Sequence, residues 1–343
     1  MANLTERQKL ILALIIREHS KSTQPVGSKS LVDLYDLEYS SATVRNEMSI
    51  LAENGLIHQP HTSAGRVPTE EGYRYFVSEL MGTTELPETT KRNISNQFYQ
   101  TPDEMEAWLR VAASTLAINA QAASLVTAPQ AMQAVFKHLE LISLRGRQVL
   151  LILVLQGGEV RQQMLTLGEP VDQTKLSKAA SRVVKLCMGL DYDQVRSLIP
   201  PADPLEADIL KLTVDLLESS TSVTLGEVYR DGLTHMLGEP AFADVENARR
   251  ALRILEERSL LKDLLLQTMG NAEIGVVQVL IGGESDWEEL SECSIVLARY
   301  GVPNAVTGML GVLGPIRMPY VQTISTVRFI AELLSDKVAG THA

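Results

Sequence analysis

A chain of 343 residues with a net charge of −11 is long enough for two or three domains. Apolar residues make up 45% and charged residues 21% of it, which excludes a disordered or collagen-like chain and favours ordinary globular cores. The longest apolar runs, residues 10–16 and 149–155, are far shorter than the roughly twenty residues that a membrane-spanning helix needs, so we expect no membrane span.

The N-terminus and the cysteines indicate a compartment. Arg7 and Lys9 precede the first apolar run, as in a signal peptide, but charged residues follow it at once without a small-residue cleavage site. Cys187 and Cys293 belong to no CxxC pair, so neither a disulfide framework nor a zinc site is indicated. We therefore expect a cytoplasmic protein without a cofactor.

The first eighty residues show four helical patterns. A capping box and apolar residues at helical spacing predict a helix over residues 5–18. A turn with Pro and Gly at residues 22–27 separates it from a short helix over residues 28–36. A third helix is predicted over residues 40–54, where serines can cap its start. A fourth helix is predicted over residues 69–81, with a threonine as its cap.

The third predicted helix has two chemically different faces. Val44, Met48 and Leu51 share an apolar face that would pack on the first two helices. The other face would meet base edges as a recognition helix, with Arg45 reading guanine and Asn46 reading adenine through paired hydrogen bonds. The candidate DNA-contacting residues on this helix are Ser41, Thr43, Arg45, Asn46 and Ser49.

A strand, turn and strand follow this helix. Residues 56–59 and 66–68 flank a small polar turn, which predicts a wing whose tip can approach a DNA backbone closely. Thr62 and Ser63 at the tip and Arg66 at the base are the candidate contacts with phosphate or the minor groove.

The charge of this region is close to neutral. Residues 1–81 contain eight Lys and Arg against ten Asp and Glu, so they contribute −2 of the −11. Because binding depends on the face that meets phosphate, a negative total does not exclude DNA. We expect affinity to come from a few well-placed contacts and from two copies acting together.

Other interpretations of this region stay open. Short three-helix heads also serve as protein-interaction modules, and Arg45 and Asn46 would then be ordinary solvated residues. His58 and His61 are near enough to suggest metal ligands, but no further Cys, His or carboxylate stands at ligand spacing, so we expect no metal site.

Four runs of sequence resemble one family. SSATVRNEM at residues 40–48 and QPHTSAGRVPT at residues 59–69 resemble the heat-inducible transcription repressor HrcA family. IGGE at residues 281–284 and GVLGPIRMPY at residues 311–320 are similar to its C-terminal signatures. The resemblance implies a homodimeric repressor of chaperone operons that binds an inverted repeat in double-stranded DNA, is kept competent by the GroE chaperonin, and releases DNA on heat stress.

The rest of the chain predicts a multidomain α+β fold. Strands, a long helical excursion and strands again indicate a sheet domain with an insertion. Predicted strands cover residues 148–155, 160–167, 275–281, 293–300 and 306–312, and predicted helices cover residues 103–128, 244–269 and 319–338. With names taken from the resemblance, the expected domains are an N-terminal winged helix-turn-helix (1–82), a linker (83–102), a GAF-like α/β sheet domain (103–171 and 271–343) and an inserted, mainly helical dimerisation domain (172–270).

Enzyme motifs are missing from the sequence. It has no GxGxxG opening a helix, no GxxxxGK[ST] and no GxSxG, so we expect no enzyme. Glu284 and Arg317 face a small-molecule pocket, form a structural ion pair or belong to a surface turn. Two alternatives to a heat-responsive repressor therefore remain: a regulator whose GAF-like domain binds a metabolite, and an enzyme with an appended DNA-binding head.

Overall fold

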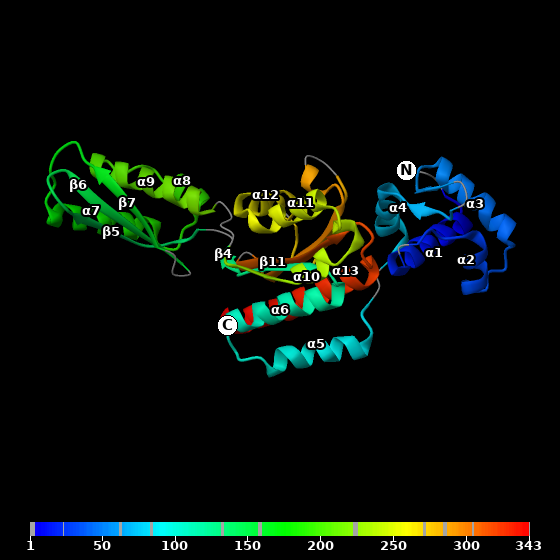
Figure 1. Cartoon of the computed structure of the whole chain (residues 1–343). Helices are drawn as coiled ribbons and strands as arrows, with labels where there is room; N and C mark the ends of the chain where they lie inside the picture. Colours follow the sequence, from blue (N-terminus) through cyan, green and yellow to red (C-terminus); the bar gives the residue numbers. More distant parts are fainter. Residues whose placement is uncertain are drawn as a thin grey trace. The chain divides into compact units, whose positions relative to one another are not determined.

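The computed structural model divides into two compact units, which are described separately (Figure 1). Unit 1 comprises Met1–Ala128, Gly226–Gly301 and Gly308–Ala343, and unit 2 comprises Pro129–Leu225 and Val302–Thr307. The insertion therefore begins and ends earlier than the expected residues 172–270, and the sequence-based borders were wrong. The structure describes residues 4–22, 24–61, 64–82, 85–131, 134–156, 160–221, 226–269, 272–283, 287–303 and 305–342.

The head, residues 4–82, has the predicted winged helix-turn-helix order. The capping box at its start is confirmed, because the Thr5 and Gln8 backbone N–H groups donate to each other's side chains at 2.9 and 3.3 Å. Val44, Met48 and Leu51 are buried, as predicted. The elements of the head are α1 (Glu6–Ser22), α2 (Ser28–Tyr35), α3 (Ser41–Glu53), β1 (Ile57–His58), β2 (Val67–Pro68), α4 (Glu70–Tyr75) and the π-helical turn η1 (Phe76–Leu80).

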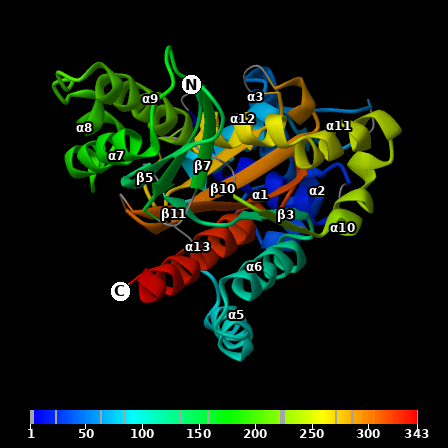
Figure 2. The same cartoon turned by 90° about the vertical axis from the view of Figure 1, so that its left-hand side faces the viewer.

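Unit 1 also contains an antiparallel sheet covered on both faces. The strand order is β8-β3-β11-β10-β9, and β4 pairs with Val306 and Thr307 at the start of β11, residues that belong with β4 to unit 2. Helices α6 and α13 lie side by side under one face, while α11 and α12 cover the other (Figure 2). Double coverage explains why β10 and β11 are almost continuously apolar and buried. The elements are α6 (Met105–Ala120), β3 (Ala123–Thr127), β4 (Gln130–Ala131), β8 (Val228–Asp231), α10 (Leu233–Leu237), η2 (Pro240–Phe242), α11 (Val245–Glu256), α12 (Arg258–Met269), β9 (Val277–Ile281), η3 (Glu288–Leu290), β10 (Cys293–Val302), β11 (Val306–Pro315) and α13 (Tyr320–His342).

Two expectations about the segment after the head were wrong. The expected linker at residues 83–102 contains helix α5 (Glu88–Gln100), which buries Ile94 and Phe98 and packs on α6. Those two residues stand four apart, so they lie on one helix face despite the polar composition around them. The helix expected over residues 103–128 ends at Ala120, because Gln121 adopts a left-handed φ of 51° and β3 begins directly afterwards.

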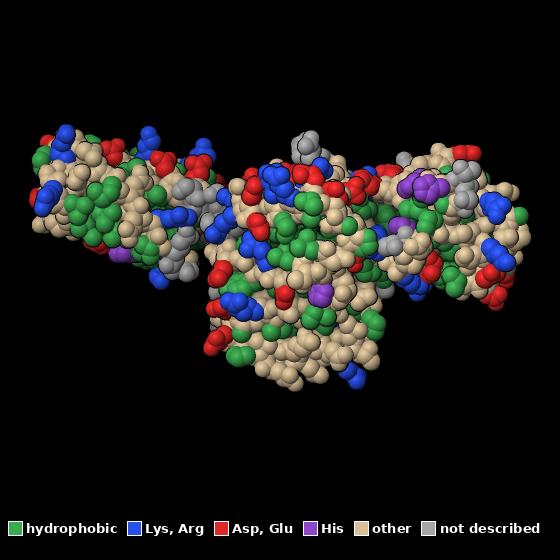
Figure 3. Space-filling view, viewed as in Figure 1, with side chains coloured by type: hydrophobic (Ala, Val, Ile, Leu, Met, Phe, Trp, Pro, Cys, Tyr) green, Lys and Arg blue, Asp and Glu red, His purple; other side chains and the backbone are tan. Residues whose placement is uncertain are grey.

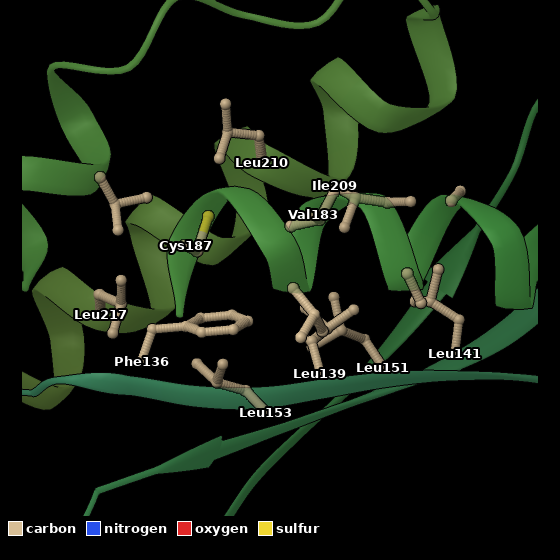
Figure 4. Close-up of a cluster of buried hydrophobic side chains, with 14 of the residues drawn as sticks. Phe136, Leu139, Leu141, Leu151, Leu153, Val183, Cys187, Ile209, Leu210 and Leu217 are labelled. Atoms are coloured by element: carbon tan, nitrogen blue, oxygen red, sulfur yellow. The ribbon is translucent and has the colours of Figure 1, made fainter. Parts of the chain in front are cut away.

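Unit 2 is a three-stranded antiparallel sheet with helices on one face. The predicted strands over residues 148–155 and 160–167 are confirmed as β6 and β7, which pair antiparallel. Figure 4 shows side chains of this sheet, such as Phe136 and Leu151, pointing toward Val183 of the covering helix. The unit contains β5 (Phe136–Ser143), β6 (Gln148–Leu155), β7 (Val160–Thr166), α7 (Gln173–Cys187), α8 (Tyr192–Arg196) and α9 (Pro204–Thr221).

Candidate DNA-binding site

Helix α3 presents the predicted polar face to solvent. Its start is fixed by the Ser40 hydroxyl, which accepts a hydrogen bond of 3.1 Å from the Thr43 backbone N–H. Ser41, Arg45 and Asn46 are exposed, and Thr43 and Ser49 are half-buried. Neither the Arg45 guanidinium nor the Asn46 carboxamide is hydrogen-bonded within the described part of the chain. Both groups are therefore available to base edges without first breaking an internal contact.

A buried carboxylate holds α3 against α1. Glu47 is only 5% exposed, accepts a hydrogen bond of 3.0 Å from Gln8 Nε2, and forms an ion pair with Arg7. The Arg7 guanidinium also lies 5.5 Å from the centre of the Tyr39 ring. The sequence analysis missed this cluster. The sequence does contain a signal for it. Glu47 stands three residues after Val44 and therefore lies on the apolar face of α3, where a charged side chain requires partners.

Arg66 lies at the base of the wing, as expected. Its backbone exchanges hydrogen bonds of 2.8 and 2.9 Å with Val26 in the turn before α2, and its Nη1 donates to Gln59 Oε1 at 2.6 Å. Gly65 permits this close approach, because a Cβ there would lie 2.5 Å from the Val26 carbonyl. The other two wing candidates, Thr62 and Ser63, lie outside the described residues.

The start of α2 adds a cation that the sequence analysis did not select. Gly27 is the N-cap residue and has no side chain that could cap the first-turn N–H groups. Lys29 and Ser30 are exposed on this turn. Helix-turn-helix proteins place the helix before the recognition helix across the DNA backbone, where such groups meet phosphate.

His19 lies in the core of the head beside an aromatic side chain. Its Nδ1 is 2.8 Å from the Tyr73 hydroxyl. Burial first, and the neighbouring Arg317 and His58 to a smaller extent, together lower the pKa of His19 from 6.5 to about 4. The imidazole is therefore neutral at pH 7 and contributes a hydrogen bond rather than a charge.

This lowered pKa predicts a pH dependence of stability. The unfolded chain takes up the proton near pH 6.5 while the folded head resists it, so the free energy of unfolding should fall between pH 6.5 and pH 4, by up to about 3 kcal/mol. His19→Asn, which cannot titrate, should lose this part of the dependence. Urea titrations of both proteins across that range measure the difference. An unchanged profile in His19→Asn, or an equal change in the exposed His61→Gln control, would contradict the assignment.

The described residues also bear on a metal site, a membrane-spanning helix and reactive cysteines. They contain no group of three His, Cys, Asp or Glu side chains that could hold a metal ion, and no helix among them is long and apolar enough to cross a membrane. Both cysteines are buried, which raises the pKa of Cys187 to about 11 and that of Cys293 to about 12. Arg317 forms an ion pair with Glu239, which the sequence did not suggest, and Glu284 lies outside the described residues.

Comparisons with known proteins match both the head and the rest of the chain to one family. Residues 3–81 match the family model described as winged helix-turn-helix transcription repressor, HrcA DNA-binding, and residues 106–324 match the model of the HrcA protein C terminal domain. A relative from Roseiflexus castenholzii, named heat-inducible transcription repressor HrcA, is 43% identical over 99% of this chain and 96% of its own. The relative of the same name from Thermomicrobium roseum is 39% identical over 97% of this chain and 95% of its own.

A solved structure shares the fold. It is described only as a hypothetical protein, is 22% identical, covers 99% of this chain and 100% of its own, and superposes with a TM-score of 0.62. The two family models together span the winged head and most of the sheet domain with its insertion. On the strength of these matches and of the relatives' near-complete coverage, the chain belongs to the HrcA family of heat-inducible transcription repressors.

Proposed function

We propose that this protein represses transcription by binding a specific DNA inverted repeat and that heat releases it. One observation carries the proposal: α3 exposes Arg45 and Asn46 beside a capped N-terminus, and its opposite face is locked into the head by apolar packing and by Glu47. A recognition helix needs this combination of free base-reading groups and a rigid position.

Each candidate residue then has a role. Arg45 and Asn46 contact base edges in the major groove, with Ser41, Thr43 and Ser49 beside them. Contacts with the DNA backbone position the head without reading sequence. The residues proposed for the backbone are Arg66, Thr62 and Ser63 on the wing and Lys29 on α2.

A DNA titration tests this proposal. The probes are the inverted repeat upstream of a chaperone operon and a scrambled duplex of equal length, each at two salt concentrations. We expect a preference for the repeat of about a thousandfold or more, the lower end for specific binders. Equal, weak binding to both duplexes at both salt concentrations would exclude sequence recognition by this head.

Arg66→Ala should weaken binding to every sequence alike. A phosphate contact carries no sequence information, so the discrimination between the two duplexes should persist while the slope of log K against log salt falls by about 1 per head. Arg66→Lys keeps the charge and should retain most of that slope. A loss confined to the specific repeat would show instead that Arg66 reads bases.

We also propose that two copies associate through the outer face of the unit 2 sheet. Ile142, Leu150 and Met164 are opposite one another in the strand register and point away from α7, and Ile142 and Met164 are exposed. Hydrophobic side chains gather on unit 2 in Figure 3. A large exposed apolar patch is unusual in a monomer and marks an interaction surface.

A substitution that introduces a charge on this sheet face tests the proposed dimer interface. Ile152 lies in the middle strand of the same face, so Ile152→Lys should convert dimers to monomers in sedimentation and weaken binding to the full repeat far more than to a half-site. Ser181→Lys, exposed on α7, is the matched control. If Ile152→Lys remained dimeric, the dimer interface would lie elsewhere.

The resemblance supports several further assignments. We propose that unit 2 is the dimerisation domain, that the sheet domain of unit 1 is GAF-like, and that the protein acts in the cytoplasm with the GroE chaperonin keeping it competent. Adding chaperonin to the DNA titration should raise the fraction of active repressor, because chaperonins bind chains that expose apolar surface before they fold. An active fraction that does not respond to chaperonin would contradict that partnership.

A further inference from the structure

Unit 1 contains a cavity that the DNA-binding site does not use. Its volume is about 830 Å³, within the range of roughly 300 to 1,000 Å³ that small-molecule sites occupy. It is bordered by one side of α1, by the segment before α5, and by the first turn of α13. These three segments lie far apart in sequence, so the cavity is formed by the tertiary structure of unit 1.

The walls of this cavity are mainly apolar. Leu14, Phe76, Leu86 and Tyr320 line it, and Leu10, on the same wall, is 44% exposed. An exposed leucine beside other apolar residues in a concave site is poorly solvated, and an apolar ligand would remove that surface from water. The walls therefore favour a hydrocarbon chain.

Some of the polar groups that line the cavity already form hydrogen bonds with other residues, and others do not. Lys21 donates to Glu18 at 2.6 Å, and Glu85 accepts from Lys91 at 2.8 Å. The Gln322 amide donates to the Asn119 carbonyl at 3.1 Å. Arg17, exposed on α1, makes no hydrogen bond or ion pair with another described residue. Arg17 is therefore the cation that remains available to a ligand.

We propose that this cavity binds a free fatty acid of medium chain length, with the acyl chain against the apolar walls and the carboxylate on Arg17. A guanidinium matches a carboxylate through two parallel hydrogen bonds. The Glu85 carboxylate on the lining repels a doubly charged headgroup, such as a phosphate monoester, more strongly than a singly charged one, because the repulsion grows with the charge. A single negative charge on a flexible chain fits both features.

Calorimetric titration of the full-length protein with hexanoate, octanoate and decanoate tests this binding. Affinity should rise about fourfold for each methylene added, because each buried CH₂ gains a roughly constant free energy, until the cavity is full. Decanol, which keeps the chain and lacks the charge, should bind about tenfold more weakly than decanoate. An affinity that does not depend on chain length, or that is equal for decanol and decanoate, would overturn the proposal.

Two variants locate the site. Arg17→Gln should weaken the binding of decanoate about tenfold and leave the binding of decanol unchanged. A general loss of structure would weaken the binding of both. Arg145→Gln, exposed in unit 2, is the matched control and should change neither ligand. Ala13→Phe should fill the cavity and abolish binding of both, with circular dichroism confirming the fold. Unchanged decanoate binding in Arg17→Gln and in a folded Ala13→Phe would overturn the assignment, whatever the outcome of the DNA titration.

Discussion

Arg45→Ala should weaken binding to the specific repeat by about 5- to 150-fold per head, which corresponds to roughly 1 to 3 kcal/mol. The guanidinium is exposed on α3 and makes no hydrogen bond to another described residue, so all its N–H donors are available to a guanine edge. Its removal should also relax sequence choice at one base pair of each half-site. Competition binding against repeats altered one base pair at a time measures both effects.

The control for this variant is Arg145→Ala, which removes an equal charge from an exposed position in unit 2. It should leave both affinity and sequence choice unchanged. If Arg45→Ala lost affinity uniformly across all repeats, Arg45 would be a phosphate contact. If discrimination did not change at any base pair, the assignment of Arg45 as a base reader would fail.

Gly72→Ala should destabilise the head by about 3 kcal/mol, the upper end of the usual cost of overpacking. A Cβ at this position would lie 2.1 Å from the Leu56 carbonyl oxygen, which is a backbone atom. That carbonyl cannot easily shift, because it accepts a hydrogen bond of 3.1 Å from the Thr69 backbone N–H. Hydrogen exchange of amides in the head measures the loss without requiring the whole chain to unfold in one step.

Gly340→Ala provides the matched control. A Cβ there meets nothing within 4 Å, and the residue lies in helix α13, where alanine is favoured over glycine. This variant should be neutral or slightly more stable. Equal protection of the head in Gly72→Ala and in the unsubstituted protein would show that the contact between Leu56 and α4 yields at little cost.

The helices of the head could be predicted because their start signals are local. The capping side chains at Thr5, Ser40 and Thr69 each bond a backbone group three residues away. The exposed positions of Arg45 and Asn46 followed from helix periodicity alone. Such features need no knowledge of the rest of the fold.

The features that the sequence analysis missed depend on distant partners. The Glu47 cluster joins residues 39 apart, and nothing near Glu47 in the sequence specifies Gln8 as its donor. The borders of the insertion were misplaced because β8 belongs to the central sheet through its pairing with β3, across the whole of unit 2. Strand β5 was missed because a register shift between Phe136 and His138 interrupts its alternation.

The strand order of the central sheet has a consequence for synthesis of the chain. Strand β3 lies between β8 and β11 in the sheet but precedes both of them in the sequence. It can therefore pair with these neighbours only after the strands that begin at Val228 and Val306 have been synthesised. Closing such long loops costs entropy before any pairing repays it, which makes high contact order chains slow to fold. During that interval the apolar β3 has no partner strand and is prone to aggregate. The central sheet therefore cannot be completed until the final third of the chain has been synthesised, however quickly the head folds.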